Sequence, residues 1–226
     1  MNNPNALLYK SLIINSFAGL LVYVAWLQGW LLLVFESDAS YLSLVMAALF
    51  VIFWIVSAYH IVVINREIVR FETRQPEGIA YEYFNKIRAK SIKLDGGLVD
   101  QFMLAGALRV RLMMPIHILH YVANMLILLG LIGTVVGFVI AVAGLGDSLA
   151  GGENLQRVQG VLGQIVTGMG VALFTTLVGA ILGGLWLQLH YQILERAIAG
   201  LVVDVVEHAD IEIIPELAKV NSTNPQ

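Results

Sequence analysis

Three threonines are the side chains best suited to chemistry in the apolar part of this chain. Thr134 lies in one long uncharged run, and Thr175 and Thr176 lie together in another. A threonine hydroxyl often bonds only to the carbonyl group one turn back in its own helix. It is also an oxygen group that hydrogen-bonds to a carboxylate or to water and that ligates a hard cation. The three positions therefore predict either local helix bonding or a polar lining that awaits a charged partner.

Small residues accompany the threonines at helical spacing. Residues 130–184 hold 14 of the 21 glycines, and steps of three and four residues place the small side chains on one stripe of each helix. The first stripe consists of Gly130, Thr134, Gly137, Ala141 and Gly144. The second consists of Gly168, Ala172, Thr176, Gly179 and Gly183. Such stripes either let membrane helices pack closely or line a narrow lumen that holds another chain's helix and a few waters.

The threonine centred in each stripe favours the lumen. We expect Thr134 and Thr176 to face it, and Thr175, about 100° round the helix, to face away from the centre of its stripe. The expected pore-lining set is Thr134, Thr176, Thr175, Gly130, Gly137, Ala141, Ala172 and Gly179.

No Asp, Glu, Lys or Arg lies in any of the four long apolar runs. Proteins that move protons usually carry a titratable group inside the membrane, so a self-contained pump is disfavoured. Four histidines, His60, His117, His120 and His190, lie near the ends of the runs, where we expect an interfacial position. The sequence has no nucleotide-binding loop, metal cluster or nucleophile with a base beside it. We therefore expect neither an enzyme nor a cofactor or metal site, and no nucleic-acid partner.

The composition is that of an integral membrane protein. The chain is 58% hydrophobic and 13% charged, and its mean hydropathy is +0.80, whereas a soluble domain is about 25% charged. We expect an all-α fold with four transmembrane helices, over about residues 11–35, 41–64, 118–145 and 158–191. Each run is long enough to cross about 30 Å of hydrocarbon as a helix.

The spans divide the chain into four regions. We expect an N-terminal transmembrane hairpin at 1–64, a cytoplasmic helical region at 65–117, a pore-forming pair of spans at 118–191 and a cytoplasmic C-terminal helix and tail at 192–226. Region 65–117 holds nine of the 13 Lys and Arg residues. Because positive charge stays in the cytoplasm, both termini are expected there.

The loop between the last two spans is expected on the far, periplasmic side of the membrane. It carries Asp147 and Glu153 and a single basic residue, Arg157. Carboxylates there either concentrate cations at the mouth of a pore or form a plain hydrophilic turn.

Two short motifs resemble those of the MotA/TolQ/ExbB channel subunits. Leu131-Ile-Gly-Thr-Val-Val-Gly137 is similar to the motif of the penultimate helix in ExbB and TolQ, and Ala172-Leu-Phe-Thr-Thr-Leu-Val-Gly179 is similar to the motif of their last helix. They occur in the expected order, after a basic cytoplasmic region. The resemblance covers residues 118–195.

The resemblance implies the channel subunit of an ion-driven rotary motor in a bacterial inner membrane. Five copies would surround a dimer of a single-span MotB/TolR/ExbD-like partner that brings one transmembrane aspartate. Thr134 and Thr176 would correspond to the family's pore-facing pair. The transported ion is expected to be H⁺, and Na⁺ stays open, as does the process that the motor drives: flagellar rotation, outer-membrane energisation, gliding or phage defence.

Two other classes of function stay open at this point. In the first, the chain is a structural membrane scaffold in which the glycine stripes only pack helices. In the second, it is a small-solute channel that acts alone. Valine at Thr134 and Thr176 separates the scaffold from a channel, because a scaffold tolerates both changes.

Overall fold

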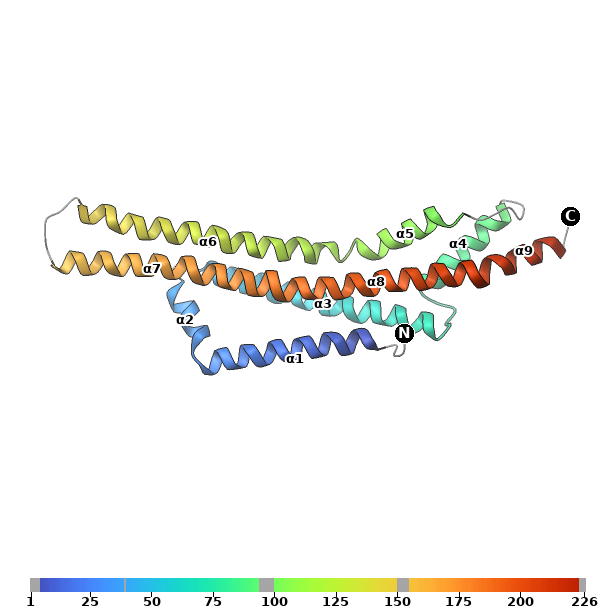
Figure 1. The fold of residues 1–226 in the computed structure, drawn as a ribbon, viewed down its shortest axis with the longest axis horizontal. Coiled ribbons are helices and arrows are strands. Elements are labelled where there is room, and N and C mark those ends of the chain that lie inside the picture. The colour runs from blue at the N-terminus through green and yellow to red at the C-terminus, as the bar shows by residue number, and fades with distance from the viewer. Residues whose placement is uncertain (1–4, 39, 94–99, 150–154, 224–226) are drawn as a thin grey trace. The chain divides into compact units, whose positions relative to one another are not determined.

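The computed structural model describes residues 5–38, 40–93, 100–149 and 155–223, and these are all helical or form the turns between helices (Figure 1). The expected all-α fold is therefore confirmed for the described part of the chain. Within these described ranges, four helical segments are long and apolar enough to cross a membrane: Ala6–Leu27, Leu42–Glu72, His117–Ala143 and Gln159–Leu217.

The run from residue 11 to residue 35, expected as one span, contains two helices. Helix α1 is Ala6–Leu27 and helix α2 is Trp30–Ser37. Gly29 lies between them with φ 73°, in the left-handed region that glycine adopts without steric cost. A glycine in this conformation ends a helix, and Figure 1 shows that α2 takes a new direction after it.

Asp38 forms the turn into helix α3, Leu42–Glu72. Its Oδ1 accepts hydrogen bonds from the backbone N–H and the hydroxyl of Ser40, and its Oδ2 accepts the N–H of Ser43 at 2.6 Å. Burial pushes the pKa of this carboxyl upward, but the hydrogen bonds from Ser40 and Ser43 outweigh burial and hold the pKa below its ordinary value. The ionised carboxylate therefore caps α3.

The structure divides into two compact units, each described here by itself. The first contains residues 58–118 and 191–226 with the start of α1, and the second contains residues 13–57 and 119–190.

In the first unit, the chain turns after α3 and continues as α4, Ile79–Lys93, and α5, Phe102–Met113. The turn contains Gly78 with φ 104°. The next N–H, that of Ile79, donates to Glu67 Oε2 at 2.8 Å, and Arg70 pairs with the other oxygen of Glu67 at 2.7 Å. One buried carboxylate thus holds the start of α4 against α3.

Polar contacts then join α4 to α5 and to the end of the chain. Arg111 of α5 pairs with Glu82 of α4 at 2.7 Å. The hydroxyl of Tyr83 donates to Gln101, whose amide donates to Asp210 at 3.0 Å. Asp210 belongs to a π-helical segment, η2, Ala209–Ile213, between α8, Gln188–His208, and α9, Ile214–Thr223.

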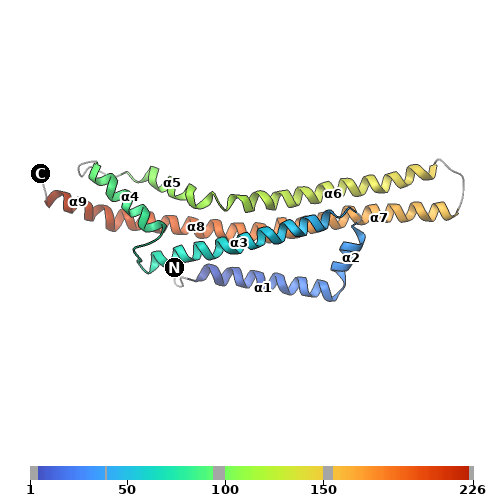
Figure 2. The same cartoon turned by 180° about the vertical axis from the view of Figure 1, so that it is seen from behind.

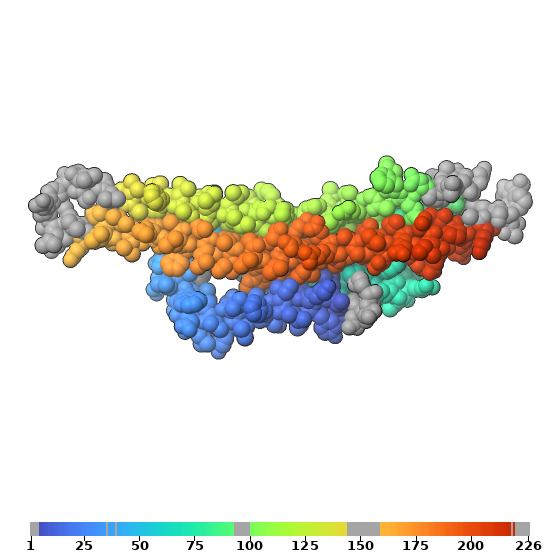
Figure 3. Space-filling model, in the orientation of Figure 1, coloured from blue at the N-terminus to red at the C-terminus, as the bar shows by residue number. Residues whose placement is uncertain are grey.

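The second unit contains the two longest described helices of the chain's later half. Helix α6 is His117–Leu149, and α7 is Leu155–Gly179. A π-helical segment, η1, Ala180–Leu187, joins α7 to α8. Figures 1 and 2 show α6 lying beside α7 and η1 from both directions, and Figure 3 shows their side chains meeting without a gap over the part drawn in colour.

Candidate functional site

The small-residue stripes of α6 and α7 pack against each other inside one chain. A Cβ atom added at Gly137 would lie 2.5 Å from the backbone nitrogen of Ala172 and closer still to the carbonyl oxygen of Gly168. One added at Gly168 would meet Ala141 in the same way. Contacts below 3.0 Å leave no room for a side chain, so the two backbones are in direct contact, as small residues allow in membrane helices. We call this contact surface the seam.

The seam continues along both helices toward η1. A Cβ at Gly179 would lie 2.6 Å from the carbonyl oxygen of Leu126, and one at Gly183 would lie 2.5 Å from that of Ala123. Gly130 faces the carbonyl oxygen of Thr175 at 3.0 Å from its added Cβ. Helix packing, the simpler of the two interpretations of the stripes, therefore accounts for these glycines.

Five of the residues that were expected to line a pore lie in this contact surface. They are buried in the seam between two helices of the same chain and do not face an open space: Gly130, Gly137, Ala141, Ala172 and Gly179. The physical reason is that a stripe of small residues is equally suited to a lumen and to a close helix pair, and α6 supplies the matching stripe.

Thr175 also lies in the seam, in contrast to the expectation that it faces away from the stripe. The residue is fully buried, and its hydroxyl donates to the carbonyl oxygen of Val171 at 2.7 Å. A Cβ at Gly133 would lie 2.5 Å from the Cβ of Thr175. The centre of the seam therefore passes through Gly133 and Thr175, one residue before the two threonines that were expected there.

Thr134 and Thr176 lie at the edge of the seam, and their hydroxyls meet across it. The two Oγ1 atoms form a short hydrogen bond. Both hydroxyls also lie within reach of the same two carbonyl oxygens, those of Gly130 and Ala172, at 3.0 to 3.4 Å. Thr134 is half-buried and Thr176 is exposed. The structure thus brings together Thr134 and Thr176, the first two residues of the expected pore-lining set.

In this arrangement the threonine pair is able to form a hydrogen bond with a group outside the two helices. Each hydroxyl has one proton and two lone pairs, and the acceptors in the seam exceed the donors. Thr176 is the exposed residue of the pair, and rotation about its Cβ–Oγ1 bond turns the hydroxyl proton toward a carboxylate or a water at the edge without breaking the helix backbone bonds.

The predicted mouth residues are not tested by the structure. Asp147 belongs to α6, but its side chain is not among those described, and Glu153 lies outside the described residues. Both stay predictions.

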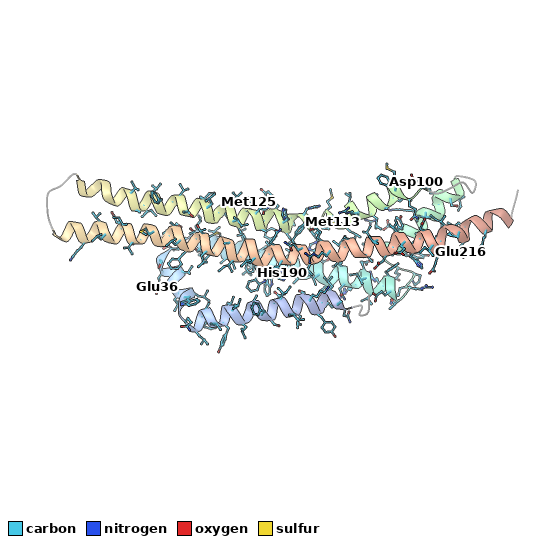
Figure 4. All side chains as sticks on the ribbon, viewed as in Figure 1. Glu36, Asp100, Met113, Met125, His190 and Glu216 are labelled. Carbon is cyan, nitrogen blue, oxygen red and sulfur yellow. The ribbon has the colours of Figure 1, made fainter. Side chains whose placement is uncertain are left out.

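A second polar cluster, which the sequence analysis did not find, joins α1, α3, η1 and the start of α8 within the second unit. The Oδ1 of Asn15 accepts the indole N–H of Trp54 at 2.9 Å and that of Trp186 at 3.4 Å. Its Nδ2 lies 3.0 Å from Nε2 of His190, whose Nδ1 lies 2.9 Å from the carbonyl oxygen of Trp186. His190, labelled in Figure 4, is only 1% exposed, so its ring is buried among side chains of the second unit.

The signal for this cluster was available in the sequence. Asn15 is an amide in the middle of an otherwise apolar run, and such a group requires a partner in a membrane because no water competes for it. The identity of the partners was not available, since they are 39 to 175 residues away along the chain.

Comparison with known proteins supports the resemblance. A family model described as the MotA/TolQ/ExbB proton channel family matches residues 103–206. Searches of curated proteins and of solved structures found no match. The matched segment begins in α5 and ends in α8, so it contains the whole seam with its three threonines, Thr134, Thr175 and Thr176. Over these residues, the chain is similar to the MotA/TolQ/ExbB proton channel family.

Proposed function

We propose that this chain is the channel subunit of a proton-driven motor, in which five copies form a ring around a dimer of a single-span partner. The observation that carries the proposal is the hydroxyl pair of Thr134 and Thr176 at the open edge of the seam. The family match over residues 103–206 supports a channel of this type.

The charge distribution explains why a partner is needed. From His117 to Ala143 and from Gln159 to Leu194 there is no Asp, Glu, Lys or Arg. The hydroxyl pair binds a proton carrier but does not itself titrate near neutral pH. The partner therefore supplies a transmembrane carboxylate, and the pair faces it.

In the proposed cycle, a proton enters from the periplasmic side and neutralises the partner's aspartate. The neutral carboxyl group moves past the apolar side chains of the ring at a much lower free-energy cost than the carboxylate does. Thr176 and Thr134 hydrogen-bond to the carboxylate or its water when it faces them, and the next subunit repeats this step. The ring thereby turns around the dimer.

The arrangement in the membrane is also part of the proposal. The inner membrane of a bacterium holds the ring, with both termini and the region 65–117 in the cytoplasm and Asp147 and Glu153 at the periplasmic mouth. This orientation places 12 of the 13 Lys and Arg residues in the cytoplasm, in keeping with the positive-inside rule.

Native mass spectrometry and a flux assay test this proposal together. The chain is purified with the single-span, Asp-bearing product of a neighbouring reading frame, and a mass of five copies plus two is expected. In liposomes, protons should cross only when both chains are present. A monomer or dimer in mild detergent, or equal flux from the chain alone, contradicts the proposal. Flux that requires sodium and resists a protonophore replaces protons with sodium.

A further inference from the structure

The exposed side of the seam continues beyond the threonine pair along α6. Six seam residues of α6 are buried at steps of four, three, four, three and four: Leu119, Ala123, Leu126, Gly130, Gly133 and Gly137. The residue that follows each of them lies on one flank of the helix, because each is rotated by the same 100°. That flank contains, in order, His120, Asn124, Ile127, Leu131, Thr134 and Phe138.

The opposite helix presents a matching flank. Thr176 follows the buried Thr175, Gly184 follows the buried Gly183, and Gln188 follows the buried Leu187. Thr176, Gly184 and Gln188 are separated by multiples of four residues through η1, where the backbone bonds widen: the N–H of Gln188 donates to the carbonyl oxygen of Gly183, five residues back. The π-helical segment therefore keeps Gln188 on the flank of Thr176.

Three contacts show that these two flanks form one edge. Thr134 bonds to Thr176. A Cβ at Gly184 would lie in ordinary contact with Ile127, 3.6 Å from its Cδ1. Gln188 Oε1 lies 3.2 Å from Nδ1 of His120. The seam edge, as we call it, thus runs from the threonine pair to His120.

The far end of the seam edge is a polar site. Asn124 donates through Nδ2 to Nε2 of His120 at 3.1 Å, and Nδ1 of His120 faces Gln188 Oε1. Because an amide nitrogen only donates and an amide oxygen only accepts, Nε2 of His120 faces a donor and Nδ1 faces an acceptor. Asn124 itself is exposed.

The depth of this site argues against contact with lipid. The span His117–Ala143 is centred on Gly130, and Asn124 lies about 9 Å from that centre along the helix. The hydrocarbon layer extends about 15 Å from its middle, so Asn124 lies within it. An exposed amide at that depth is stable only where it faces water or another chain.

We infer that the seam edge is a hydrated path, and that His120, held by Asn124 and Gln188, is the group through which protons leave it on the cytoplasmic side. This inference rests on the proposed function and adds an exit site to it. His190, two residues beyond Gln188, takes no part, because it is buried against Asn15.

The chemistry at His120 needs only proton binding and release. A proton from water in the path binds the lone pair of Nε2, while the amide of Asn124 rotates so that its oxygen accepts the new N–H. The ring then loses one proton to water on the cytoplasmic side, and the amide returns. No other bond forms or breaks, and the ring holds the same number of protons at the end as at the start.

Cysteine labelling tests the path without any need for flux. The natural chain has no cysteine, so each variant carries a single thiol. Ile127, on the seam edge, and Leu128, its neighbour, are 44% and 52% exposed and lie at nearly the same depth. In membranes, a charged, impermeant thiol reagent should modify Ile127→Cys at least tenfold faster than Leu128→Cys. Equal rates, or labelling of neither, overturn the inference.

The role of His120 is tested by proton flux in liposomes that contain the chain and its partner. His120→Gln keeps a hydrogen-bonding side chain but cannot accept a proton, and flux should fall at least tenfold. The control is Met125→Leu, at the next position on α6 after Asn124 (Figure 4), which should conduct as the wild type does. Wild-type flux in His120→Gln overturns the exit role. If the wild type with its partner conducts no protons, that result contradicts the proposed function instead. The cysteine labelling rates alone then decide whether the seam edge is hydrated.

Discussion

Gly137 of α6 and Gly168 of α7 touch each other's backbone, so that a Cβ atom on either would collide with the carbonyl oxygen of the other. Because the contact is reciprocal, both glycines are needed for the close approach of α6 and α7 at the seam. The threonine pair depends on it, because the helices must approach this closely for the hydroxyls of Thr134 and Thr176 to meet.

The seam predicts opposite effects for two glycines of the same helix. Gly168→Ala places a methyl group against α6, and overpacking of this kind costs about 1–3 kcal/mol. Gly163→Ala is the matched control, since nothing lies within 4 Å of an added Cβ there, and alanine favours the helix by up to about 1 kcal/mol. Thermal unfolding in detergent should show a lower midpoint for the first variant and an unchanged or higher one for the second. An equal midpoint in both variants contradicts close packing at the seam.

The Asn15 cluster predicts a loss of stability on truncation. Asn15→Ala removes the acceptor of the Trp54 and Trp186 indoles and the partner of His190 Nε2. Leaving a buried polar group unpaired costs about 1–3 kcal/mol, so denaturation should require less denaturant. Thr167→Val is the control, because its exposed hydroxyl bonds only to its own helix at Gly163. If both variants unfold alike, the cluster does not stabilise the second unit.

The Asp38 cap predicts a dependence on acid. The folded pKa of Asp38 lies below its ordinary value of 3.8, so the cap contributes fully above about pH 4 and is lost as the pH falls through the folded pKa. Asp38→Asn should be less stable at pH 7 and should lose less stability than the wild type on acidification below pH 4. Thermal midpoints measured from pH 7 to pH 2 test this. Parallel curves for the two proteins contradict it.

The sequence predicts the four apolar runs and the basic region between the second and third of them, because hydropathy and charge are local signals. It also predicts that Thr134 and Thr176 belong together. It does not predict that Thr175, one residue away, is the buried member, since a rotation of 100° is decided by the partner helix. The partners of Asn15 are likewise tertiary, and neither η1 nor its effect on Gln188 follows from the local sequence.

Proton flux through Thr176 variants tests the account most directly. Thr176→Val keeps the shape of the side chain and removes the hydroxyl of a residue that is exposed at the seam edge. A hydrogen bond to a charged group contributes about 1.5–3 kcal/mol, so flux in liposomes with the partner should fall about tenfold or more, and Thr176→Ser should restore most of it. Thr175→Val, whose hydroxyl is already bonded to Val171, should be milder. Wild-type flux in Thr176→Val, with or without an effect of Thr175→Val, contradicts the account.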